Sequence, residues 1–233
     1  MKRGKKYLEK IEGLNLADKY SVEEALKLVR GASYAKFDET LELHVRLGID
    51  PRQSDQQLRG TVVLPSGTGR AKTVAVVAQG DALAAAKDAG ADFFGGDDLI
   101  ERIQGGWFGF DVLITTPDMM AKVSRLGKSL GSKGLMPSPK GGTVTQDVKS
   151  AVSEFKAGKV EYRNDKGAII HLPIGKLSFT DEQLIENLTT VMDVLVKSKP
   201  AKTKKGAYLK SVALSSTMGP GVLVDTTKSK WKE

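Results

Sequence analysis

The pattern of apolar residues changes twice along the 233-residue sequence, and these changes limit the possible folds more than any single motif. Residues 40–47 alternate strictly between polar and apolar side chains, which is typical of a strand with one buried face. From residue 72 onward, continuous apolar runs alternate with helix-like segments, the pattern of parallel β-α-β units. After Gly158, short alternating strands return. The sequence therefore predicts two architectures in one chain.

Neither flank of the chain has enough elements to close a core alone, but the two flanks together supply several strands and at least two helices. We therefore predict a discontinuous α+β domain, of split β-α-β type, formed by residues 1–66 and 160–233. Residues 67–159 would be inserted into it as a Rossmann-like α/β domain. Linkers near residues 67–69 and 157–158 would join the two domains and permit them to open and close.

Local signals place several elements within these domains. Ser21 and Glu24 have the spacing of a capping box, and Thr180 precedes a long amphipathic helix. A further helix is predicted for residues 117–131, with proline at its first position. Residues 164–167 read Asn-Asp-Lys-Gly, which predicts a tight hairpin turn between two strands.

Composition excludes several kinds of site. Cysteine is absent, and the only two histidines, His44 and His171, are far apart in sequence. Disulfides, thiolate metal sites and a histidine metal cluster are therefore not expected, and no metal or cofactor is predicted. The basic N-terminal stretch is not followed by an apolar segment of signal-peptide length, and no uncharged apolar run could span a bilayer. We expect a cytoplasmic protein with no membrane partner.

The charge balance favours a polyanionic partner. The formal net charge is +8 and the pI is about 9.4, which suits contact with phosphates. Residues 67–159 carry 12 basic and 10 acidic side chains, so most of the excess lies in the flanks. One part of it is a lysine-rich connector at residues 197–205.

Two glycine-containing motifs invite a nucleotide-binding interpretation, and both lack a required residue. Residues 67–69 read Gly-Thr-Gly but have no third glycine and precede a strand rather than a helix. Residues 127–129 resemble the end of a Walker motif, yet Lys122 stands where its first glycine is needed. No nucleophile, base and acid have a diagnostic spacing, so no catalytic residues are predicted.

A cationic loop follows this region. Lys128, Lys133 and Lys140 stand among glycines and prolines, with no acidic residue between Asp118 and Asp147. Many exposed main-chain amides and three cations suit contact with phosphate. A solvated loop held by its apolar residues explains the same pattern equally well.

Polar and aromatic residues at two strand ends form a second candidate site. Lys36 and Phe37 precede the alternating strand, and Thr40 and Glu42 lie on its polar face, an arrangement that could stack on and read unpaired bases. Residues 215–221, Ser-Ser-Thr-Met-Gly-Pro-Gly, end another strand with backbone that a partner can approach closely. The alternative is that Phe37 is a core residue and that residues 215–221 form an ordinary turn with a methionine filling the core.

Four motifs together carry a family resemblance. The stretches FDETLELHVRLGIDPR, LPSGTGR, GSKGLMPSPKGGTV and STMGPGV occur in this order, and with them essentially the whole chain resembles the bacterial large-subunit ribosomal L-one family. The resemblance implies a protein of the ribosomal stalk that binds 23S rRNA beside the tRNA exit site, touches other large-subunit components and assists release of deacylated E-site tRNA. It also implies repression of the protein's own operon mRNA, as in many bacteria.

The resemblance also implies site residues in both domains. In the discontinuous domain the RNA-binding candidates are Lys36, Phe37, Thr40, Glu42, Ser211, Thr217, Met218 and Gly219. Secondary RNA contacts in the inserted domain would come from Lys133, Gly134 and Lys140. The family loop usually has Pro and Arg where this chain has Ser132 and Lys133, and Asn at Ser138, so the charge remains but the planar fork of arginine is lost.

Two other functions remain as alternatives. A nucleotide-dependent enzyme would use the inserted α/β domain, and saturable nucleotide binding with turnover would distinguish it. A general single-strand binder would prefer unstructured oligonucleotides to folded RNA.

Overall fold

The computed structural model describes residues 4–200, 203, 207–226 and 231. The chain divides into two compact units, a discontinuous unit of Met1–Gly69 with Tyr162–Glu233 and an inserted unit of Arg70–Glu161. Part of the lysine-rich connector, residues 201, 202, 204 and 205, lies outside the described residues.

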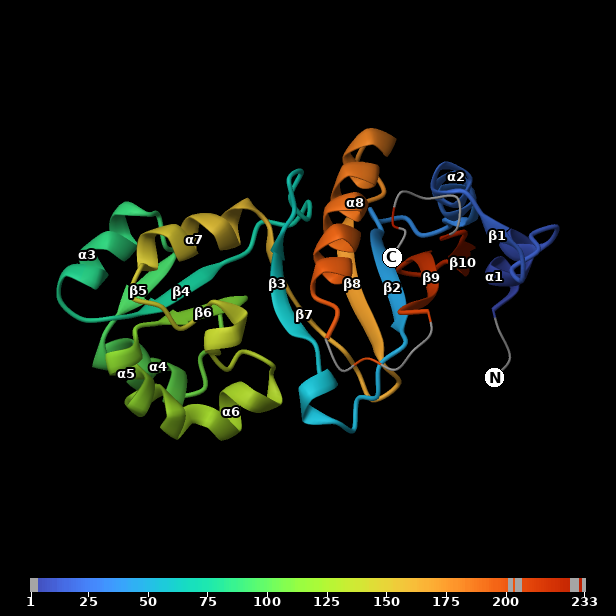
Figure 1. Cartoon of the computed structure of the whole chain (residues 1–233). Helices are drawn as coiled ribbons and strands as arrows, with labels where there is room; N and C mark the ends of the chain where they lie inside the picture. The colour runs from blue at the N-terminus through green and yellow to red at the C-terminus, as the bar shows by residue number, and fades with distance from the viewer. Residues whose placement is uncertain (1–3, 201–202, 204–206, 227–230, 232–233) are drawn as a thin grey trace. The chain divides into compact units, whose positions relative to one another are not determined.

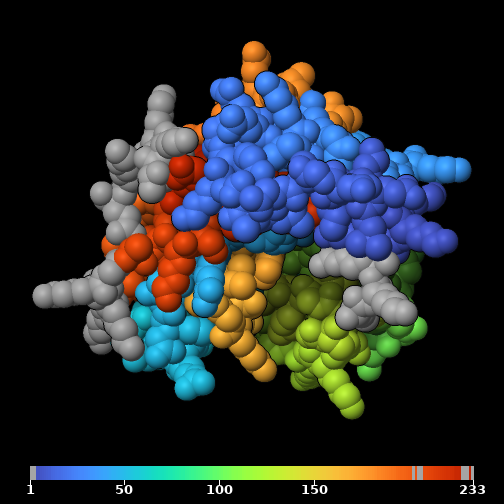
Figure 2. Space-filling view, turned by 90° about the vertical axis from the view of Figure 1, so that its right-hand side faces the viewer, coloured from blue at the N-terminus to red at the C-terminus, as the bar shows by residue number. Residues whose placement is uncertain are grey.

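A five-stranded mixed sheet forms the centre of the discontinuous unit. In spatial order its strands are β1 (Lys19–Tyr20), β10 (Gly221–Val224), β9 (Leu209–Ser216), β2 (Thr40–Leu47) and β8 (Ile169–Lys176). β1 pairs with β10 in parallel, and the other pairs are antiparallel. The apolar residues of β2, from Leu41 to Leu47, are buried, which confirms the predicted alternation. Figure 2 shows how segments from the two ends of the sequence form one continuous surface of this unit.

Two helices cover one face of this sheet and leave the polar face of β2 open. α2 (Val22–Ala32) packs against β9 and β10, α8 (Asp181–Lys197) packs against β8, and the two helices contact each other. Both predicted capping signals are confirmed: Ser21 and Glu24 form a capping box, and Thr180 forms another. The unit also contains α1 (Lys5–Ile11) and the 3₁₀ turn η1 (Ser54–Gln56). The predicted α+β class is therefore confirmed, whereas the split β-α-β arrangement stays a prediction.

The predicted hairpin around residues 164–167 is only partly right. A turn is present, because the Asp165 N–H donates to Ile169 O at 2.8 Å. Beyond one bridge, however, the flanking strands join different sheets: β7 (Lys159–Arg163) pairs with β3 (Arg59–Val63), whereas β8 pairs with β2. The reason is the hydrogen bonding of Asn164. Its side-chain Oδ1 accepts the Leu58 N–H at 2.7 Å, and its main-chain N–H donates to Leu58 O. These bonds tie the end of β7 to the segment before β3.

A buried asparagine forms hydrogen bonds with the segment through which the chain leaves the discontinuous unit. Asn187, on α8, is 0% exposed. Its Oδ1 accepts the Ser66 N–H at 3.0 Å, and its Nδ2 donates to Gly67 O at 3.0 Å and to Ile174 O at 2.8 Å. The polar groups of a segment that leaves the sheet are thereby satisfied inside the protein.

The inserted unit is a three-layer α/β structure (Figure 1). Its parallel strands, in spatial order, are β5 (Phe93–Gly95), β4 (Val74–Val77) and β6 (Val112–Thr115). One face of the sheet packs against α4 (Asp97–Gln104), α5 (Pro117–Val123) and α6 (Gly127–Ser132). The other face packs against α3 (Asp81–Asp88) and α7 (Val148–Ala157). Parallel pairing with helices on both faces is what the β-α-β alternation predicted.

The single helix predicted for residues 117–131 is interrupted. A 3₁₀ turn, η2 (Ser124–Leu126), separates α5 from α6. The Ser124 hydroxyl donates to Met120 O at 2.7 Å, and Gly127, a weak helix former, follows the turn. The break leaves Val123, Leu126 and Leu130 all buried against the same core.

Candidate nucleic-acid interface

Two of the predicted contact residues meet where β2 begins and β9 ends. The Thr217 Oγ1 accepts the Thr40 N–H at 3.0 Å and lies 3.4 Å from Thr40 O. One residue further into the strands, Leu41 pairs with Ser216. The turn after β9 is therefore fixed to the first residue of β2, although 177 positions separate the two threonines in sequence.

A buried carboxylate that the sequence did not single out holds this arrangement together. Glu39 is 1% exposed. One of its oxygens accepts the Met218 N–H at 2.9 Å, and the other accepts the Ser33 hydroxyl at 2.5 Å and the Ala35 N–H at 3.2 Å. Burial raises the pKa of Glu39, but hydrogen bonds from these donors outweigh burial and bring the pKa below its ordinary value. Glu39 thus links the loop before β2 to the turn after β9.

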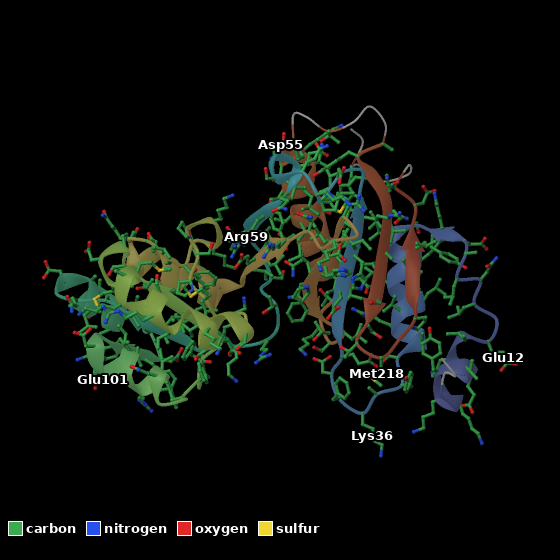
Figure 3. All side chains as sticks on the ribbon, turned by 90° about the horizontal axis from the view of Figure 1, so that it is seen from below. Glu12, Lys36, Asp55, Arg59, Glu101 and Met218 are labelled. Atoms are coloured by element: carbon green, nitrogen blue, oxygen red, sulfur yellow. The ribbon has the colours of Figure 1, made fainter. Side chains whose placement is uncertain are left out.

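Two apolar side chains project from these fixed segments into solvent. Phe37 is 57% exposed and Met218 is 46% exposed. The interpretation of either one as a core residue is therefore wrong. Lys36, which precedes the phenylalanine, is also exposed, and Figure 3 shows Lys36 and Met218 at one end of the discontinuous unit, with Asp55 at the opposite end. A flat aromatic ring, a flexible thioether and a cation on rigid backbone suit contact with unpaired bases and phosphates.

Gly219 closes the turn under this surface. Its N–H donates to Ser216 O at 3.2 Å, and a Cβ atom at this position would lie 2.5 Å from the Ser216 hydroxyl oxygen. Because Ser216 is buried, any side chain at position 219 would force its hydroxyl to move within a buried site. The absence of a side chain leaves the main chain beside Met218 accessible to a partner.

A further cation lies beside the site. Lys176, the last residue of β8, is paired with Thr40 across the sheet. Its Nζ donates to the Thr40 hydroxyl at 2.9 Å and to Asp38 O at 3.2 Å. This lysine carries no local sequence signal, since only the register between β2 and β8 brings it to the threonine.

The remaining two predicted contacts lie further along the polar face of the sheet. Glu42 pairs with Ser215, and Ser211 pairs with Arg46 near the other end of β2. Ser211 and Thr217 are six positions apart in sequence, roughly 20 Å in extended strand. The structure thus places Ser211 on the same face of the sheet as Thr217 but outside the cluster around Glu39.

The two histidines, far apart in sequence, are in contact on this face. His44 pairs with His171 across β2 and β8, and their Nδ1 atoms are 2.7 Å apart. Among the described residues, no group of three or more His, Cys, Asp or Glu side chains is placed to hold a metal ion. The two imidazoles are therefore in contact despite their separation in sequence.

The proposed secondary contacts lie in the inserted unit. Lys133 and Lys140 are exposed, and the Lys133 Nζ lies 4.7 Å from the centre of the Phe108 ring. Gly134, next to Lys133, has a positive φ of 71°, a conformation that favours glycine. A hydrogen bond within the loop stabilises it: the Thr143 Oγ1 accepts the Ser138 N–H at 2.7 Å. Exposed cations on an ordered loop are compatible with phosphate contact and with simple solvation.

No helix among the described residues has the length and apolar character needed to cross a membrane.

Comparison with known protein families identifies the family to which the chain belongs. A sequence model described as the ribosomal protein L1p/L10e family matches residues 28–220, a range that includes every candidate contact from Lys36 to Gly219. Ribosomal proteins are generally not enzymes, which counts against the nucleotide-dependent alternative. The chain therefore belongs to the ribosomal protein L1p/L10e family, and as a member it has a structural role in the large ribosomal subunit and binds rRNA.

Proposed function

We propose that the chain binds the stalk region of 23S rRNA beside the E site through the end of the discontinuous unit that carries Phe37 and Met218. The observation that carries this proposal is the exposure of both apolar side chains on backbone that Glu39 and Thr217 hold in place. Such a surface loses little conformational freedom when it meets RNA, so more of the contact energy contributes to affinity. Lys36 and Lys176 supply cations for nearby phosphates.

The proposal extends to the wider role of the stalk. As a ribosome-associated protein the chain would assist release of deacylated E-site tRNA, with secondary RNA contacts from Lys133, Gly134 and Lys140. The same surface would bind its own operon mRNA and repress translation. Competition between the mRNA leader and the rRNA fragment for the protein tests the shared surface directly, because distinct surfaces would bind both RNAs at once.

Two substitutions test the main contact. Thr217→Val removes the acceptor for the Thr40 N–H while nearly keeping side-chain volume, and Met218→Asp places a negative charge where RNA phosphates approach. We expect both variants to lose binding to a transcribed stalk fragment of 23S rRNA, measured by filter binding, while circular dichroism stays unchanged. A matched control is Phe94→Asp in the inserted unit, which changes another exposed aromatic side chain and should leave affinity intact. Wild-type affinity in both variants would remove the proposed surface from the site.

Binding to folded RNA is also distinguishable from general single-strand binding. The stalk fragment should bind far more tightly than an unstructured oligonucleotide of the same length at the same salt concentration. Equal affinities would favour the single-strand alternative.

A further inference from the structure

The centre of the open sheet face lies between the two groups of proposed contacts. Thr217 stands at one end of this face and Ser211 at the other, opposite Arg46. Halfway along, His44 of β2 lies opposite Ala213 of β9 on one side and His171 of β8 on the other. RNA that contacts both ends therefore runs beside His44 of the neighbouring strand, and His171 lies one strand further.

The two histidines form a hydrogen-bonded pair whose geometry limits its charge. The Nδ1 atoms of His44 and His171 are 2.7 Å apart, and the His44 Nε2 lies 2.8 Å from the Ser215 hydroxyl oxygen. One Nδ1 must donate and the other accept, since two Nδ1–H groups facing each other at this distance would repel. The pair can thus hold one positive charge without loss of its hydrogen bond, but not two.

Among the described residues, the charged side chains nearest this pair come from β2 and from the turn before β8. On β2 the neighbours are Glu42, whose carboxylate lies 3.9 Å from the His44 Nε2, and Arg46. From the turn before β8, the Asp165 carboxylate lies 3.6 Å from the His171 Nε2. The facing residues of β9 and β10 carry no charge; they are Ser211, Ala213, Ser215, Gly221 and Leu223. Two lysines lie further from the pair on the same sheet: Lys176 of β8, beside Thr40, and Lys19 of β1, which is paired with Leu223.

The surroundings of His44 favour its neutral form in the free protein. Burial lowers the pKa of His44, the neighbouring His171 lowers it further, and Glu42 opposes both. His171 is more exposed than His44, so a ligand can reach the pair from solvent. A phosphate placed there would favour the protonated pair.

We propose that the His44–His171 pair is a phosphate contact of the bound RNA and that RNA binding is coupled to the uptake of one proton by the pair. This inference rests on the proposed RNA-binding function. If RNA favours protonation, protonation must favour RNA by the same factor, because linkage is reciprocal. Affinity should therefore rise as the pH falls toward 6.

The chain offers a clean test, since these are its only two histidines and no other side chain has an ordinary pKa in this range. The dissociation constant for the stalk fragment of 23S rRNA is measured from pH 8 to pH 5.5 at fixed ionic strength. For the wild type we expect it to fall about fivefold or more, within the limit of about tenfold per pH unit for one proton. The double variant His44→Gln, His171→Gln keeps neutral hydrogen-bonding side chains and should show a flat profile.

A second measurement uses only the wild-type protein. Nitrogen NMR of the imidazoles gives the titration of each histidine with and without the stalk fragment, and RNA should shift the first protonation of the pair to higher pH. A histidine titration that RNA does not shift, or the same pH profile in the wild type and the double variant, overturns the inference. If the wild type still binds the fragment tightly at pH 8, the proposed RNA-binding function stands. A wild type that binds the fragment at no pH overturns both.

Discussion

Replacing the buried Glu39 with glutamine should weaken the RNA site while the protein still folds. Glutamine keeps the volume and one acceptor oxygen, but its amide nitrogen donates. If that nitrogen replaces the oxygen facing Met218, the Met218 N–H loses its acceptor. If it replaces the other oxygen, the Ala35 N–H loses its acceptor and the Ser33 hydroxyl must turn from donating to accepting, so two partners are disturbed. The first orientation of the amide disturbs fewer hydrogen bonds and is therefore favoured. The loss of stability should concentrate on the turn that carries Met218.

The magnitude follows from that single bond. A hydrogen bond to a charged acceptor contributes about 1.5–3 kcal/mol. Because the hydrogen bond between the Met218 N–H and Glu39 is only partly buried, the lower end of this range applies. We expect Glu39→Gln to lower the free energy of unfolding by about 1.5 kcal/mol. If the freed turn must be re-ordered to bind RNA, a similar cost raises the dissociation constant roughly tenfold.

Urea denaturation and filter binding to the stalk fragment measure the two effects, and amide hydrogen exchange at Met218 locates them. The pH dependence supplies an independent check. Hydrogen bonds hold the pKa of Glu39 below its ordinary value, so its contribution to stability is present above the unfolded-state pKa and is lost as the pH falls through the lower folded-state pKa. The stability gap between wild type and Glu39→Gln should therefore close under acid. A gap that persists undiminished at low pH, or unchanged stability and affinity at pH 7, would refute the role of the carboxylate.

Two further predictions concern Asn187 and the cationic loop. Asn187→Leu leaves three main-chain groups without this partner, one of them buried and two partly buried, and should destabilise the protein by roughly 3 kcal/mol in urea denaturation. Asp193→Ala, on the exposed side of the same helix, should change stability little, and equal effects of the two substitutions would contradict the anchoring role. The double variant Lys133→Ala, Lys140→Ala should reduce the slope of log affinity against log salt by up to about 2 if both lysines contact phosphates of the stalk fragment, and an unchanged slope would mean that the loop is only solvated.

The sequence predicted those features that depend on local periodicity or capping. The strict alternation of residues 40–47 identified which side chains of β2 are buried, because successive residues of a strand point to opposite faces. The spacing of Ser21 and Glu24 identified the start of α2 for an equally local reason. Glu39 had no such signal. It precedes the strand in an ordinary polar run, and its burial depends on Met218, which is 179 positions away.

The histidine pair was missed for a different reason. Its contact depends on the register between β2 and β8, and a slip of one residue would turn one imidazole to the opposite face of the sheet. Alternation gives the face of each residue but not its partner across the strands. The same limit applies to Lys176, which meets Thr40 through that register alone.

The candidate interface exists only when the two flanks of the chain have folded together. Phe37 comes from the N-terminal flank and Met218 from the C-terminal flank, and Glu39 and Thr217 join them through hydrogen bonds across the sheet. These bonds are made in the protein without RNA, so the backbone under the exposed side chains is ordered before RNA arrives. Much of the entropic cost of forming the surface is thereby met during folding rather than during binding. Substitutions at Glu39 should consequently weaken RNA binding mainly through the loss of this preorganisation, even though its buried carboxylate does not reach the RNA.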